Sequence, residues 1–200
     1  MLFWDVDTQV DFLSPTGRLY VPESEKLIPN LRQLTEWAAS HNVTVISSAD
    51  AHLAGDPELQ IYGPHCMLGT PGQQKVPETL LDDRYIIPNR AIELPDLHRF
   101  QQIILEKQAF DFATNPNSGK VLQQFAAEAD VVLYGVVTEI CVSAAAQALF
   151  AAGRKLFLVR DAIAELDHAK GEAFCAEFVS RGGKVVTTRE VTSSPNPRLN

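Results

Sequence analysis

Short, nearly continuous apolar runs recur along the chain and predict the strands of a sheet. Six runs rich in Val, Ile, Leu and Phe occupy residues 2–6, 43–47, 103–105, 131–136, 155–159 and 184–187. Strands that are buried on both faces give continuous apolar runs, whereas half-buried strands alternate apolar and polar residues. We therefore expect a parallel sheet that is covered on both faces.

Segments with helical spacing of apolar residues separate several of these runs, at residues 24–39, 118–129, 143–152 and 168–180. Ser118 is the expected N-cap of the second segment, and Gly153 is the expected end of the third. Alternating strands and helices are typical of a doubly wound α/β domain. The pattern predicts one domain, a three-layer α/β/α sandwich with a mostly parallel, Rossmann-like central sheet.

Residues 53–100 interrupt this alternation, with six prolines and little periodicity. An irregular stretch of this length in a compact domain is more often a functional insertion than a connection without a role. No repeat or linker divides the chain, so we expect a single domain over residues 1–192. The polar, proline-containing segment 193–200 is expected to be a flexible tail.

The composition restricts which classes of partner the protein is expected to bind and which cellular compartment it is expected to occupy. The 17 basic and 25 acidic side chains give a net charge of −8, which argues against binding to nucleic acid or an anionic membrane. Three cysteines are too few for a disulfide framework and favour a reducing compartment. The amino-terminal residues lack a signal peptide, and polar residues interrupt the apolar stretch 131–152, so we expect a cytoplasmic protein without a membrane span.

Residues suited to chemistry follow four of the predicted strands. Asp7 follows the first, Asp50 and His52 follow the second, Lys107 ends the third and Cys141 lies beyond the fourth. In open α/β sheets, ligands bind beyond the carboxyl ends of the strands. We therefore expect these side chains to meet at one edge of the sheet.

Cys141 lies where a helix is expected to begin. Backbone N–H groups and the helix dipole there lower a thiol pKa and can hold an oxyanion. The alternative is that Cys141 is a small buried apolar residue, as most free cysteines are. Asp7 and Lys107 favour a reactive thiol, because a nucleophile needs a base and a nearby cation. Their own alternatives are a helix-capping carboxylate and a solvated surface charge.

Asp50, His52 and His65 offer oxygen and nitrogen ligands that suit a zinc-like ion with open coordination positions. The alternative is a structural pair of histidines. Cys66 is expected to pack beside its ligand neighbour. Three further residues have no other candidate site residues near them in the sequence and are expected at the surface or in the core: His41, His98 and Cys175.

Three motifs resemble those of the isochorismatase-like cysteine hydrolases, and most closely the nicotinamidases (pyrazinamidases). They are Asp-x-Gln-x-Asp-Phe at residues 7–12, Asp-x-His at 50–52 with Pro-His-Cys-Met-Leu-Gly-Thr at 64–70, and Gly-Val-Val-Thr-Glu-Ile-Cys-Val at 135–142. Together with Lys107, the motifs match in order from about residue 2 to residue 165. The resemblance implies the isochorismatase-like hydrolase fold.

The resemblance also implies a role for each matched residue. Asp7 would be the general base and acid, Lys107 the cation and Cys141 the nucleophile. The implied ligands of Zn²⁺, or of another divalent ion such as Mn²⁺ or Fe²⁺, are Asp50, His52, His65 and, as a candidate addition, Glu58.

Two further site features come from the same resemblance. The family has a non-proline cis peptide at the position of Val136–Val137. The backbone N–H groups of Val137 and Cys141 would form the oxyanion hole, and Phe12 is a candidate substrate-binding residue.

The implied activity is hydrolysis of nicotinamide to nicotinate and ammonia through a Cys141 thioester. Ala51 stands where nicotinamidases usually have Trp, Glu139 replaces an Asp, and the segment 53–64 is short. Alternatives are therefore hydrolysis of another small amide or ureido compound, vinyl-ether hydrolysis of the isochorismatase type, or a non-catalytic scaffold with structural zinc. The expected partners are a small-molecule amide and further copies of the chain, in a homodimer or homotetramer.

Overall fold

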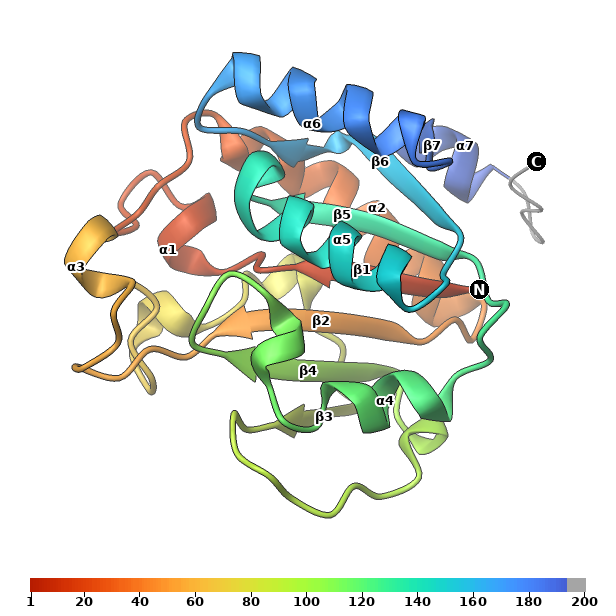
Figure 1. Ribbon diagram of the computed structural model, residues 1–200, viewed down its shortest axis with the longest axis horizontal. Helices are drawn as coiled ribbons and strands as arrows, with labels where there is room; N and C mark the ends of the chain where they lie inside the picture. Colours follow the sequence, from red (N-terminus) through yellow and green to blue (C-terminus); the bar gives the residue numbers. More distant parts are fainter. Residues whose placement is uncertain (194–200) are drawn as a thin grey trace.

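A seven-stranded sheet forms the centre of the computed structural model, which describes residues 1–193 (Figure 1). Every strand pairing is parallel, and the strand order is β3-β4-β2-β1-β5-β6-β7. The strands are β1 (Leu2–Val6), β2 (Val45–Asp50), β3 (Arg84–Ile87), β4 (Gln102–Lys107), β5 (Val131–Val136), β6 (Leu156–Ala164) and β7 (Lys184–Val186). The predicted α/β sandwich with a parallel sheet is confirmed.

Helices cover both faces of this sheet (Figure 1). The α-helices of the described residues are α1 (Val10–Leu13), α2 (Ile28–Ser40), α3 (Leu59–Tyr62), α4 (Ser118–Gln124), α5 (Ser143–Ala151), α6 (His168–Ser180) and α7 (Thr188–Thr192). Alternate residues of β1 enter two separate cores, because successive side chains of a strand point to opposite faces. Trp4 packs in the core under α4, α5 and α6, whereas Phe3 packs in the core under α2 and α7.

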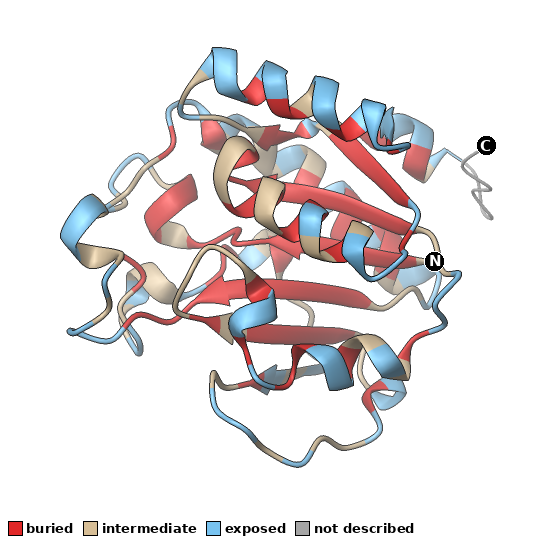
Figure 2. Cartoon of the chain, viewed as in Figure 1, coloured by how far each residue is buried: buried red, intermediate tan, exposed pale blue. Residues whose placement is uncertain are grey.

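Burial follows the same layering (Figure 2). All residues of β1, β2 and β5 are buried, as continuous apolar runs predict. The short edge strand β3 lies inside the stretch that showed no periodicity, and only its last residue, Ile87, is buried. An edge strand with so little buried surface has no clear sequence pattern.

Two details of the predicted helices are wrong. The segment 118–129 is helical only to Gln124, and Asn117, not Ser118, is its N-cap residue. The helix ends early because the buried Arg154 guanidinium donates hydrogen bonds to the carbonyl groups of Leu122, Phe125 and Ala126. Residues 194–200 of the expected flexible tail lie outside the described residues.

Candidate active site

Four of the predicted residues meet at the carboxyl edge of the sheet. Asp50 and Lys107 are register partners at the ends of β2 and β4, and Asp7 directly follows the neighbouring strand β1. Ligand atoms of Asp7, Asp50 and Cys141 all lie within 4.8 Å of one another. The parallel arrangement therefore places these side chains in one cluster, as expected.

Lys107 is the centre of this cluster and is only 1% exposed. Its Nζ lies 2.9 Å from Asp7 Oδ2 and 3.7 Å from Cys141 Sγ, and it donates a hydrogen bond to Asp50 Oδ1. A buried ammonium between two carboxylates is the opposite of a solvated surface lysine. Burial alone favours neutral lysine, but the charges of Asp50 and Asp7 outweigh it and hold the pKa of Lys107 well above its usual range.

The thiol of Cys141 holds its proton in this environment. Burial raises the pKa of Cys141 well above its ordinary value; the Lys107 charge opposes this shift, and Asp7 and Asp50 add to it. Asp7 Oδ1 accepts a hydrogen bond from Ser48 Oγ at 2.7 Å. The other carboxylate oxygen, Oδ2, faces Lys107. A thiol, a carboxylate and an ammonium in contact can transfer a proton between the first two while the third balances the charge.

Cys141 lies on a single π-helical turn, Thr138–Val142, that leads directly into α5. The side chain is 5% exposed, so it is enclosed by the protein. The Val136–Val137 peptide is cis, which confirms that expectation. An oxyanion hole formed by Val137 and Cys141 stays a prediction.

A second cluster adjoins the first through Asp50. Ligand atoms of Asp50, His52, Glu58 and His65 all lie within 4.8 Å of one another. Glu58 Oε1 is 3.6 Å from His65 Nε2 and 3.8 Å from His52 Nε2, and His52 Nε2 is 3.9 Å from Asp50 Oδ2. Ligands on a tetrahedral zinc ion, with bonds of about 2.0–2.2 Å, are separated by about 3.3–3.6 Å. The Glu58–His65 distance falls at the upper end of this range, and the other two distances are slightly wider.

Three buried atoms of this cluster point at one another without a hydrogen-bond partner among the described residues: Asp50 Oδ2, His52 Nε2 and His65 Nε2. Buried polar atoms without partners are costly, and a bound cation satisfies lone pairs of this kind. Burial lowers the pKa of His52 and raises the pKa of Asp50 to about 7. The donor set of two imidazoles and two carboxylates therefore fits a zinc-like ion.

Two residues that hold the site together were not singled out from the sequence. Gln9 Oε1 accepts the Asp50 backbone N–H at 2.7 Å, and Gln9 Nε2 donates to the Asp50 carbonyl at 2.8 Å. Asp11 Oδ2 accepts the Cys66 N–H at 2.7 Å, directly after the candidate ligand His65. Both residues belong to the motif at residues 7–12, which was the available signal.

Phe12 and Cys66 complete the surroundings of His65. The Phe12 ring packs against the His65 ring at a centroid distance of 5.7 Å and is 3% exposed. Its contact with a substrate stays a prediction. Cys66 is buried with its Sγ 3.8 Å from the Gly72 carbonyl oxygen, in agreement with a packing role.

Comparison with known proteins agrees with this architecture. Residues 3–190 match the isochorismatase domain family. A pyrazinamidase of Pyrococcus horikoshii, solved in complex with zinc, is 26% identical, with a TM-score of 0.74 over 93% of this chain and 98% of the other. An N-carbamoylsarcosine amidase from Thermoplasma acidophilum is 25% identical, with a TM-score of 0.74 over 94% and 96%.

A nicotinamidase/pyrazinamidase from Bacillus subtilis has a TM-score of 0.77 over 92% of this chain and 98% of the other, and its 20% identity supports the fold alone. The search of curated proteins found no match. The fold and the matched domain place the protein among the isochorismatase-like hydrolases. The chain belongs to the isochorismatase family.

Among residues 1–193, no helix combines the length and the apolar character that a membrane span requires.

Proposed function

We propose that the protein is a metal-dependent cysteine amidohydrolase and that its substrate is nicotinamide, which it converts to nicotinate and ammonia. The observation that carries the proposal is the contact of one buried ammonium, Lys107, with the Asp7 carboxylate and the Cys141 thiol. A structural zinc site needs none of these three groups. The zinc complex of the pyrazinamidase, at 26% identity, supports the same class of reaction.

In the first half-reaction, Asp7 takes the proton of Cys141, and the sulfur attacks the amide carbon. A carbon–sulfur bond forms, and the negative charge moves to the carbonyl oxygen, which the backbone N–H groups of Val137 and Cys141 stabilise. When the tetrahedral intermediate collapses, the carbon–nitrogen bond breaks and Asp7 returns the proton to the departing ammonia. Lys107 keeps the net charge of the cluster balanced throughout.

In the second half-reaction, Asp7 takes a proton from water, and the resulting hydroxide attacks the thioester carbon. The carbon–sulfur bond breaks, the carboxylic acid is released and the proton returns to Cys141. The same carboxylate therefore acts as base and acid in both halves, which follows from its place beside the thiol.

Asp50, His52, His65 and Glu58 would hold the metal, with zinc the preferred identity for this donor set. When bound, the cation supplies an electrophilic centre that can orient a ring nitrogen of the substrate. Asp50 belongs to both clusters, because Lys107 binds its Oδ1 while Oδ2 points at the imidazoles. The protein therefore aligns the two halves of the site through one carboxylate.

A ureido amide is the second candidate substrate, because the N-carbamoylsarcosine amidase matches at 25% identity and Ala51 replaces an aromatic residue of the nicotinamidase pattern. A homodimer or homotetramer and a cytoplasmic location complete the proposal. Sedimentation of the purified protein measures the oligomeric state.

Ammonia release from nicotinamide and from N-carbamoylsarcosine tests the proposal, using wild type, Cys141→Ala and, as a matched thiol control, Cys175→Ala. We expect wild type and Cys175→Ala to release ammonia from nicotinamide, and Cys141→Ala and chelator-treated wild type to be inactive. If ammonia is released only from N-carbamoylsarcosine, and this release depends on Cys141, the substrate is the ureido compound and not nicotinamide. Full activity of Cys141→Ala would refute the mechanism.

A further inference from the structure

Asp56 is a carboxylate beside the metal cluster that is not one of its candidate ligands. It lies in the segment between β2 and α3, six residues after the end of β2. Its Oδ2 is 3.0 Å from His52 Nδ1 and also accepts the Leu53 N–H at 2.8 Å. The side chain is 15% exposed, so water competes only weakly for these contacts.

The contact determines which nitrogen of His52 carries the proton. An ionised carboxylate only accepts hydrogen bonds, so Nδ1 must donate to Asp56. Nε2 then carries the lone pair, and this is the atom that is buried without a hydrogen-bond partner among the described residues and faces Asp50 and Glu58. The hydrogen bond also fixes the rotation of the ring. Asp56 thus holds His52 in the tautomer and orientation that a metal requires.

The two imidazoles of the cluster are held in different ways. His65 Nδ1 donates to the Gly63 backbone carbonyl at 2.9 Å, which no side-chain substitution removes directly. His52 depends on a side chain that carries charge. A carboxylate that accepts the Nδ1 proton of the imidazole increases the electron density at Nε2 and strengthens this atom as a ligand.

We propose that Asp56 is a positioning residue for the metal, which acts through His52 and does not touch the ion. The inference rests on the metal site of the proposed function but not on the amide chemistry. Loss of a partner of this kind lowers metal affinity by about 10–100-fold. A residue that merely closed the turn at Leu53 would change the stability of the segment and leave the affinity of the folded protein unchanged.

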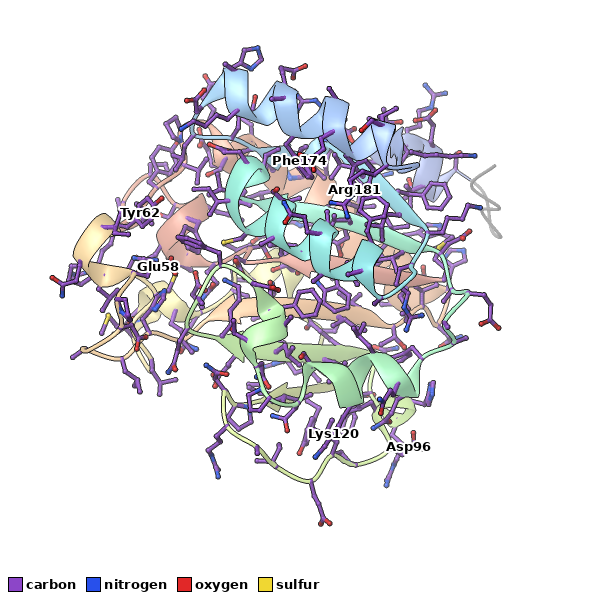
Figure 3. The ribbon with its side chains drawn as sticks, in the orientation of Figure 1. Glu58, Tyr62, Asp96, Lys120, Phe174 and Arg181 are labelled. Carbon is purple, nitrogen blue, oxygen red and sulfur yellow. The ribbon has the colours of Figure 1, made fainter. Side chains whose placement is uncertain are left out.

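Zinc affinity of the chelator-stripped protein, measured by competition with a chromophoric chelator, tests the proposal. Asp56→Ala removes the acceptor, and Asp56→Asn keeps an oxygen for the Leu53 N–H but removes the charge. Asp96→Ala is the control, because Asp96 also accepts a nearby backbone N–H, from His98 at 3.1 Å. Figure 3 shows Asp96 at the lower right of the molecule, well away from Glu58 at the left.

We expect Asp56→Ala to bind zinc about 10–100-fold more weakly than wild type, Asp56→Asn to lie between the two, and Asp96→Ala to equal wild type. The absorption spectrum of bound Co²⁺ should change in Asp56→Ala and stay unchanged in Asp96→Ala. Unfolding of the metal-free variants shows whether each is folded; if Asp56→Ala is not, Asp56→Asn decides.

Wild-type zinc affinity in the folded Asp56 variants would overturn the proposal, as would a wild type that binds no zinc. The outcome is separable from that of the proposed function. A wild type whose zinc affinity depends on Asp56 but that hydrolyses no amide refutes the amidase alone. Cys141-dependent hydrolysis with unchanged zinc affinity in the Asp56 variants refutes the role of Asp56 alone.

Discussion

Replacement of Lys107 by methionine removes the cation that, among residues 1–193, contacts both Asp7 and Asp50. Methionine has a similar length and keeps the packing volume while it removes the charge. The two buried carboxylates then face each other with no counter-charge between them. We expect the metal-free variant to lose both stability and activity.

The magnitude follows from the distances. At 2.9 Å from Asp7 Oδ2, the attraction is about 6 kcal/mol at an effective dielectric constant of about 20, before the cost of dehydrating the ammonium is subtracted. Removal of one partner from a buried ion pair typically lowers the free energy of unfolding by about 3–5 kcal/mol. For a domain of this size, the loss lowers the melting temperature by roughly 10 °C.

Urea unfolding of the metal-free protein, prepared with a chelator and followed by tryptophan fluorescence, measures this loss in the free energy of unfolding. The double variant Lys107→Met/Asp7→Asn is the informative control, because it removes one of the two unpaired charges. We expect it to be more stable than Lys107→Met alone, with a coupling energy of at least about 1 kcal/mol. A Lys107→Met variant with the wild-type unfolding midpoint would show that Lys107 does not neutralise the cluster.

Three further predictions use the same unfolding assay. Gly135→Ala should lower the free energy of unfolding by more than about 3 kcal/mol, because Gly135 has φ 118° and a Cβ would overlap the Val6 carbonyl oxygen; an unchanged midpoint would contradict this. Arg154→Met should cost about 2–4 kcal/mol and speed amide hydrogen exchange in α4; unchanged exchange would contradict this. Zinc at 100 times its Kd should stabilise wild type by about 2.7 kcal/mol but not His65→Ala; equal stabilisation of the variant would contradict the ligand assignment.

The strands that the sequence predicted best are those buried on both faces. The ends of β1 and β5 agree with the apolar runs 2–6 and 131–136, because a central parallel strand needs apolar residues throughout. The edge strand β3 was missed, because four residues with one buried side chain leave no pattern. The end of α4 depends on Arg154, which is far away in the sequence, so local periodicity could not predict it.

The meeting of the candidate site residues could be predicted for a topological reason. Parallel strands all end at the carboxyl edge of the sheet, so the polar residues that follow them converge there independently of the loop conformations. Contacts between side chains of separate segments could not be predicted in this way. The Gln9 hydrogen bonds to Asp50 and the contact of Asp56 with His52 depend on loop geometry that spacing does not encode.

The proposed mechanism requires Cys141 to carry the acyl group of the substrate. Rapid acid quenching of wild type during turnover of nicotinamide, followed by mass spectrometry of the peptides, tests this requirement most directly. We expect a nicotinoyl thioester on Cys141, formed within one turnover, and no adduct in the Asp7→Asn variant. Steady ammonia release with no acyl group on Cys141 at any quench time would contradict it, provided that a synthetic thioester survives the same quench.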